Sequence, residues 1–428
     1  MDPQPAPAQP APPSPANVQR VYLVLVLFST LAGSFIWGIN TLFLLDAGLS
    51  ATAAFAANAF FTAGMVLFEV PTGVVADTWG RRASYLLGTL TLVVSTLLYL
   101  LAWQAHSPFW VWALTSALLG LGFTFFSGAT EAWLVDALVH SGYQGELEPV
   151  FARGQVVNGA AMLTGSVAGG LVAQWTNLGV PYILRSLALA VTFLVAFVFM
   201  HDWGFTPRAG TGPVREMRRV LRSSLHYGLG NPPVRWIMLS SIASGVGIYG
   251  FYAMQPYLLE LYGDERAYGI AGLAAAIVAG AQIAGGLVAP RIRALFRRRT
   301  SALLGGVLAS SALMVLLGVT RWFPAAIVLL VLWALVFAAV MPIRQAYMNG
   351  LIPSEQRATV LSFDNMLASG GGVLEQPALG KVADVWGYGP SYVVSGAIQL
   401  LAAPFVVLAR RLRPASDEIV APTPTGRL

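Results

Sequence analysis

The chain has 428 residues, of which 56% are hydrophobic and 10% are charged, and its formal net charge is +6. Soluble globular chains carry about 25% charged residues, so most of this chain is expected to avoid water. The sequence contains no cysteine, which excludes disulfides, thiol catalysis and thiolate metal ligands.

The chain begins with a tail rich in proline and alanine, residues 1–20, which is expected to be disordered. The tail lacks the basic region and cleavage site of a signal peptide, so the next hydrophobic segment is expected to remain as a helix. A membrane-spanning helix needs about 20 mostly apolar residues. This length predicts twelve spans, at 21–45, 52–76, 84–104, 108–138, 151–174, 181–202, 234–260, 266–290, 301–320, 323–349, 357–383 and 389–409.

The predicted spans divide into two sets of six. A polar, arginine-rich segment, 203–233, separates an amino-terminal bundle, 21–202, from a carboxy-terminal bundle, 234–413, and a short tail, 414–428, ends the chain. The predicted fold is that of an all-α polytopic membrane protein. No nucleophile–base pair, metal-ligand cluster or phosphate-binding loop is recognisable, so we expect no enzyme, no metal site and no cofactor.

Arginine residues gather in the junctions on one side of the predicted bundles. Because Lys and Arg concentrate in cytoplasmic loops, this asymmetry predicts cytoplasmic termini and a place in the inner (plasma) membrane. The basic linker could bind RNA, but a position beside the membrane explains its charge, and no nucleic-acid partner is expected. The arginines on this side are Arg20, Arg81, Arg82, Arg153, Arg208, Arg215, Arg218, Arg219, Arg222, Arg291, Arg293, Arg297, Arg298, Arg299, Arg410, Arg411 and Arg413.

A short glycine-containing string recurs near the ends of the second, fifth, eighth and eleventh spans. Its leading glycines, Gly73, Gly170, Gly286 and Gly380, are 97, 116 and 94 residues apart, and the longest interval contains the linker. The repeat divides each bundle into two three-helix units that cross the membrane in opposite senses, and relates the bundles by pseudo-twofold symmetry. Inverted repeats are typical of secondary transporters, which bind their solute near the midplane between the halves.

The loop between the second and third spans has a glycine–acid–glycine–arginine–arginine pattern at 73–82. This pattern resembles the signature loop of the major facilitator superfamily, apart from Thr78, where the family often has a basic residue. The resemblance covers nearly the whole chain and implies transport by alternating access. It also assigns gating roles to Gly73, Asp77, Gly80, Arg81, Arg82 and Asp136, with Arg81 bridging Asp77 to Asp136 as a latch.

Shorter strings at 69–73, 127–136 and 153–155 are similar to those of a drug-efflux branch that includes tetracycline and macrolide exporters. This resemblance implies a monomer in the lipid bilayer that exports amphipathic or cationic small molecules in exchange for protons. The fifth span has Ser166 where such antiporters usually carry proline, which weakens the antiport assignment. Uptake or facilitated diffusion of a small nutrient and a lipid-handling membrane protein remain as alternatives.

Ionisable groups within a span are functional candidates because they are costly in lipid. We expect Glu131 to face the central cavity and carry the coupled proton, the alternative being a structural carboxylate bonded to a neighbouring helix. Glu131 points about 140° away from Asp136 around the helix, so the two acids can serve the cavity and the latch separately. Glu69 lies on the helix face of Gly73 and Asp77 and is expected to be a gate or structural group.

Two further acids, Asp364 and Glu375, lie eleven residues apart along one face of the eleventh span. They can form a second protonation route. Equally, the sole role of Asp364 can be to form an ion pair with Arg357 or Arg344, in which case it is structural.

Neutral side chains on the first and seventh spans are also predicted to line the cavity. Their spacing of three or four residues places each set along a single stripe. Aromatic and amide groups suit a bulky amphipathic solute, although packing and interfacial roles are the alternative. These residues are Trp37, Asn40, Tyr249, Tyr252 and Gln255.

Overall fold

The computed structural model describes residues 13–126, 129–207, 228–353 and 356–418, together with residues 215, 218 and 222. The described residues are almost entirely helical. The first twelve residues, most of the predicted linker and the end of the chain lie outside this description, and so does most of what was predicted for the two tails.

The helices follow one another in two sets. Four of the predicted spans consist of two consecutive helices each: α1–α2, α5–α6, α10–α11 and α16–α17. The first set is α1 (Pro15–Trp37), α2 (Asn40–Asp46), α3 (Ala51–Trp79), α4 (Arg81–Gln104), α5 (Phe109–Thr124), α6 (Ala129–His140), α7 (Glu148–Trp175) and α8 (Val180–Phe199). The second set is α10 (Pro232–Ala243), α11 (Val246–Tyr262), α12 (Tyr268–Ala294), α13 (Arg299–Val319), α14 (Phe323–Asn349), α15 (Arg357–Trp386), α16 (Tyr388–Leu400) and α17 (Ala402–Arg411).

Helix α1 begins at Pro15, earlier than the predicted start of the first span at residue 21. The Ser14 side chain accepts a hydrogen bond from the Asn17 N–H at 3.4 Å, and Pro15 occupies the first helical position. The N–H groups of the first turn have no partner within the helix. The serine side chain accepts a bond from one of them, and proline has no N–H group to leave unpaired, so both residues favour a helix start. The predicted disorder of residues 15–20 is therefore wrong.

Eleven helical segments of the described chain are long and apolar enough to cross a membrane. Helix α15 is the remaining long helix, with 30 residues, and it carries Asp364, Glu375, Lys381 and Asp384. It stands eleventh in the order of predicted spans and packs against α3 of the other half. The predicted all-helical polytopic architecture is confirmed, with α15 as the most polar of its long helices.

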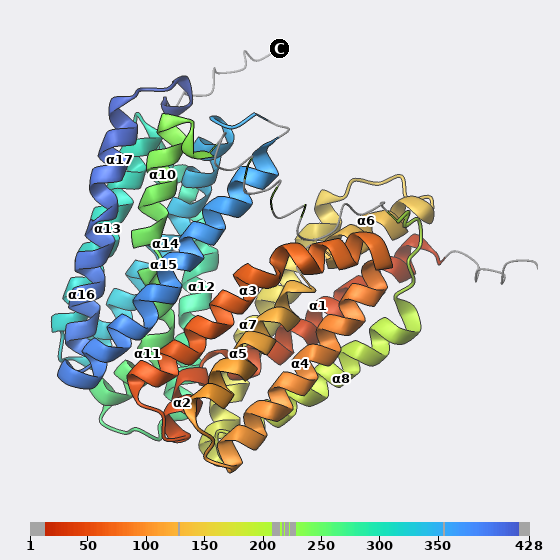
Figure 1. Cartoon of the computed structure of the whole chain (residues 1–428), viewed down its shortest axis with the longest axis horizontal. Helices are drawn as coiled ribbons and strands as arrows, with labels where there is room; N and C mark the ends of the chain where they lie inside the picture. Colours follow the sequence, from red (N-terminus) through yellow and green to blue (C-terminus); the bar gives the residue numbers. More distant parts are fainter. Residues whose placement is uncertain are drawn as a thin grey trace, which may run out of the picture.

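The two sets of helices form two bundles that meet at one end and diverge towards the other (Figure 1). At the end near α2 and α11, which we call the closed end, the buried cores mix: Leu259 and Ala271 join the amino-terminal core, and Phe55 joins the carboxy-terminal one. At the opposite end, which we call the open end, each half has its own core, around Trp133 in one and Met238 in the other.

Glycines bring the two halves into backbone contact at the closed end. A Cβ atom on Gly272 of α12 would lie 2.5 Å from the Ser166 carbonyl oxygen and 2.9 Å from the Gly170 Cα atom, both on α7. A Cβ atom on Gly38, between α1 and α2, would lie 2.9 Å from the Gly272 Cα atom. Small residues allow helices in lipid to approach this closely. Gly170, one of the repeat glycines, therefore packs between the halves.

Candidate functional site

The carboxylate of Asp384, near the end of α15, binds the first turn of α3 in the other half. It accepts hydrogen bonds from the N–H groups of Ala51 at 2.8 Å and Thr52 at 2.9 Å, and from Thr52 Oγ1 at 2.5 Å. The first N–H groups of a helix lack partners within the helix, and its amino end attracts negative charge. Asp384 therefore ties the halves together at the closed end. It follows Gly380 just as Asp77 follows Gly73, but the repeat did not predict this contact.

We expect Asp384→Ala to weaken the closed end by about 1–3 kcal/mol, because hydrogen bonds to charged groups contribute about 1.5–3 kcal/mol and exposure reduces this value. The chain has no native cysteine, so spin labels can be attached to cysteines introduced at Trp175 and Glu265, exposed positions on the two halves. Distances between the labels should lengthen. Asp264→Ala, which removes an exposed carboxylate that accepts a hydrogen bond from the Arg266 N–H of its own loop, should leave them unchanged. An unchanged distribution in Asp384→Ala would show that this contact does not hold the end closed.

Two predicted cavity residues of the seventh span are buried in packing contacts instead. Gln255 is 1% exposed, accepts a hydrogen bond from the Thr41 N–H at 2.8 Å and donates one to the Trp37 carbonyl oxygen at 2.9 Å. Tyr249 is fully buried, and its hydroxyl lies 2.6 Å from that of Ser391. In this conformation their stripe faces the closed interface and the carboxy-terminal core, and their place in the cavity stays a prediction.

A cavity of about 410 Å³ lies within the amino-terminal half. Its lining includes two candidate residues, Trp37 and Glu131, together with the aromatic rings of Phe123 and Phe126. Glu131 belongs to the first turn of α6 and is exposed. The cavity thus combines an accessible carboxylate with a largely apolar wall, which suits a solute having both polar and apolar parts.

A smaller cavity of about 100 Å³ adjoins the first and includes residues of both halves. Trp37 lines both cavities, and the predicted residues Asn40 and Tyr252 line the smaller one. The Asn40 side chain donates a hydrogen bond to Asn58 Oδ1 at 2.9 Å and accepts one from the Tyr182 hydroxyl at 2.9 Å. Its amide is therefore held in one orientation beside the cavity.

Arg185 of α8 lines both of these cavities and was not predicted. It lies near the start of the sixth span, where an arginine looks like a helix-end charge. Helix α8 begins at Val180, and Arg185 is buried between α1 and α4, with 2% of its surface exposed. The one available signal was its position a full turn inside a span whose only other charged residue, Asp202, is at the far end.

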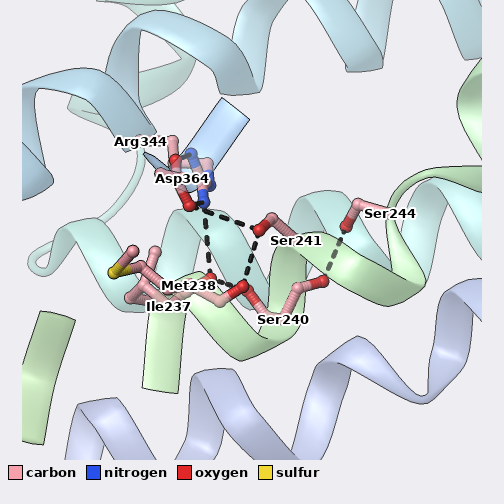
Figure 2. Close-up of polar contacts among 7 residues, drawn as sticks. All are labelled: Ile237, Met238, Ser240, Ser241, Ser244, Arg344 and Asp364. Carbon is pink, nitrogen blue, oxygen red and sulfur yellow. Dashed lines mark hydrogen bonds and ion pairs between the residues drawn. The ribbon is translucent and has the colours of Figure 1, made fainter. Parts of the chain in front are cut away.

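A cavity of about 320 Å³ lies in the carboxy-terminal half, and a buried ion pair forms part of its wall. Arg344 of α14 binds Asp364 of α15 through two hydrogen bonds, at 2.5 and 2.7 Å (Figure 2). The Ser241 hydroxyl donates to the same carboxylate at 3.2 Å, and Arg344 also donates to the Ile237 carbonyl oxygen at 3.3 Å. Of the two alternatives for Asp364, the structure contains the pair with Arg344.

Glu375 faces the junction between α10 and α11. Its carboxylate lies beside Gly245, where a Cβ atom would approach Glu375 Oε2 to 2.8 Å. This buried oxygen has no hydrogen-bond partner among the described residues. Because Asp364 contacts Ser241 and Glu375 contacts Gly245, both acids lie on the side of α15 that faces the seventh span, as their spacing predicted.

At the open end, the predicted gating loop makes a local ion pair. Arg81 Nη1 lies 2.7 Å from Asp77 Oδ1, and the Arg81 guanidinium lies over the Phe205 ring. Asp136 is half-buried and makes no ion pair with Arg81 in the part of the chain that the structure describes. The predicted bridge between Asp77 and Asp136 is thus absent from this conformation, in which the two halves are apart at this end.

The acid that contacts this loop is Asp202, which follows α8. It accepts a hydrogen bond from the Arg82 N–H, the first turn of α4, at 2.9 Å. Burial raises the pKa of Asp202, and the hydrogen bond from Arg82 opposes that shift. Gly80 has φ +107 and its missing side chain leaves room for the Asp202 carboxylate, so only glycine fits there. The sequence offered no signal for Asp202 beyond an acid at the end of a predicted span.

The remaining predicted gating residues lie on α3. Glu69 is half-buried, and Gly73, one turn later, is exposed, with no atom within 4 Å of a Cβ built there. Their gating role stays a prediction.

Two bundles of membrane-length helices that meet at one end, with a cavity in each, are the architecture of a polytopic membrane transport protein. The family model described as Major Facilitator Superfamily matches residues 22–374 and, in a second match, residues 267–427. The chain therefore belongs to the Major Facilitator Superfamily. Comparison with curated proteins found no match.

Solved structures of other transporters are similar to this chain. The nucleoside transporter NupG has a TM-score of 0.76 and 12% identity over 92% of this chain and 99% of its own. A bacterial homolog of the human lysosomal transporter Spinster has a TM-score of 0.71 and 14% identity, covering 97% and 100%. A D-xylose–proton symporter has a TM-score of 0.64 and 16% identity, covering 92% and 96%. At such identities the similarity shows the fold alone.

Proposed function

We propose that this protein is a proton-coupled secondary transporter that exports amphipathic or cationic small molecules by alternating access. The observation that carries the proposal is Glu131, an exposed carboxylate in a cavity otherwise walled largely by aromatic and apolar groups. A carboxylate in such a place can bind a cationic solute or take up a proton, and exchange of the two couples their movements. Asp364 and Glu375 are proposed as a second site at which a proton is taken up and released.

We propose that the conformation in this structure is inward-facing. The open end carries the first two turns of α4 and α7, which contain Arg81, Arg82 and Arg153, and positive charge at helix ends favours the cytoplasmic side. Both termini are then cytoplasmic, and the protein spans the inner (plasma) membrane. Closure of the open end would bring the signature loop against the other half. In that closed state Asp77, Arg81 and Asp136, all of the amino-terminal half, are proposed to form their latch.

Uptake of a small polar solute is the second candidate. The cavity walls contain several amide groups, with Asn58 and Asn158 in one half and Asn365 and Gln399 in the other. Amides of this kind form the hydrogen bonds that a polar nutrient requires. The direction of proton-driven flux distinguishes this candidate from export.

The test uses purified protein in liposomes with an imposed pH gradient. Ethidium, an amphipathic cation, should move against the direction of proton flow, and Glu131→Gln should lower gradient-driven movement at least about tenfold while the protein stays folded, because the amide can neither ionise nor take up a proton. Glu148→Gln, an exposed carboxylate outside the cavity lining, is the matched control and should transport normally. Ethidium movement that ignores the gradient in all three proteins would refute proton coupling.

A further inference from the structure

Arg185 is a buried cation with no acidic partner among the described residues. It is 2% exposed, on a helix that otherwise has no charged residue. Its Nε donates a hydrogen bond to Thr96 Oγ1 at 3.0 Å, its Nη1 donates to the Ala32 carbonyl oxygen at 3.3 Å, and the guanidinium lies 5.7 Å from the centre of the Phe123 ring. A buried charge without a counter-charge costs several kcal/mol, so the presence of an arginine at this position needs an explanation.

The two hydrogen bonds do not account for an arginine at this position. A guanidinium carries five N–H groups, and two of the five make the bonds to Thr96 and Ala32. A neutral glutamine could link the same two helices without burying a charge. The contrast with Arg344 is direct, because that arginine, although more exposed than Arg185, has a carboxylate at 2.5 Å.

The unused donors lie beside open space. Arg185, Gly33, Trp37 and Phe123 are shared by the walls of the 410 Å³ and 100 Å³ cavities, so they surround the passage between them. Gly33 has no atom within 4 Å of a Cβ built on it, so its side of the passage is empty. Guanidinium donors beside an aromatic surface suit the planar oxygens of an acidic group attached to an apolar body.

We infer that Arg185 forms a binding site for the anionic group (a carboxylate, sulfonate or phosphate) of an amphipathic solute. The rings of Trp37 and Phe123 contact the apolar part, and Glu131, elsewhere on the wall of the larger cavity, accepts a cationic group. The ligand class is therefore an amphipathic molecule that carries an acidic group, with zwitterions included. The inference rests on the proposed function only in taking this ligand to be the transported solute.

The charge that Arg185 projects into the passage can be measured without knowing the solute. Gly33→Cys introduces the one thiol of the chain at the empty side of the passage. Its rates of reaction with anionic sulfonatoethyl and cationic trimethylammonioethyl methanethiosulfonate are then compared. Adding Arg185→Gln should lower the anionic-to-cationic rate ratio about tenfold or more, because a unit charge within several ångströms acts on the two reagents in opposite directions.

Two controls accompany this measurement. Arg185→Lys keeps the charge and should retain most of the ratio, whereas Arg291→Gln removes an exposed arginine of the other half and should leave it unchanged. A ratio that stays within twofold when Arg185 becomes glutamine would overturn the inference.

A second measurement needs no substitution at Arg185. Dansylglycine and its methyl ester differ in the carboxylate charge, and the protein in detergent should bind the acid about tenfold more tightly, as expected for a hydrogen-bonded charged group. Equal binding, or no binding of the acid, would count against the site. Neither experiment requires transport, so both can succeed even if the proton-driven transport of ethidium fails.

Discussion

Replacing Arg344 by methionine should lower the free energy of unfolding by about 3–5 kcal/mol, the usual result of removing one partner of a buried ion pair. Asp364 is 2% exposed, and without Arg344 it would keep a hydrogen bond from Ser241 alone. Because the Asp364 carboxylate is buried, solvation would replace the two lost charge-assisted bonds only in part. Thermal unfolding of the detergent-solubilised protein measures the loss.

The double variant Arg344→Met with Asp364→Asn is the decisive control. It removes both charges, and the amide of asparagine can still accept from Ser241, so the variant should regain most of the lost stability. Arg291→Met, at an exposed arginine of α12, should unfold like the unaltered protein. If Arg344→Met alone changed stability by less than about 1 kcal/mol, the pair would not behave as a desolvated one.

The pair also bears on proton coupling. If Asp364 is structural, the double variant should retain proton-driven transport, and coupling then rests on Glu131 and Glu375. If Asp364 carries a coupled proton, the double variant should be stable yet uncoupled. Stability and transport measured on one variant therefore separate the two roles that the sequence left open.

Gly272→Leu should shift the molecule away from the conformation that is closed at the α2–α11 end. The added Cβ atom would meet the Ser166 carbonyl oxygen and the Gly170 Cα atom, and backbone atoms on a packed helix cannot rotate away as a side chain can. Overpacking of this kind costs about 1–3 kcal/mol, which is about 5- to 150-fold in the ratio of the two conformations. The labels at Trp175 and Glu265 should report longer distances across the closed end.

Gly280→Leu is the matched control, on the same helix, because a Cβ atom at Gly280 has no neighbour within 4 Å. It should leave the distances unchanged. Equal behaviour of the two variants would mean that the α7–α12 contact does not set the conformational equilibrium, and that the change at Gly272 is absorbed by local adjustment.

What the sequence predicted well are features that depend on neighbouring residues. Spans, their order and the two halves follow from runs of apolar residues, because in lipid each backbone N–H and C=O must be satisfied within its own helix. The signature loop is local too, and Asp77 and Arg81 do pair across four residues. The common face of Asp364 and Glu375 follows from helical periodicity alone.

What only the tertiary structure decided is which of these groups meet. Arg185 reads in sequence as a charge near a helix end, and its burial depends on how α1 and α4 pack around it. Asp384 binds a helix more than 300 residues earlier, and Gln255 sits in the interface rather than the cavity. A charge or amide within a span must find a partner in a low-dielectric interior, but periodicity specifies only the direction in which it points. The partner is set by the packing of helices that are remote in sequence.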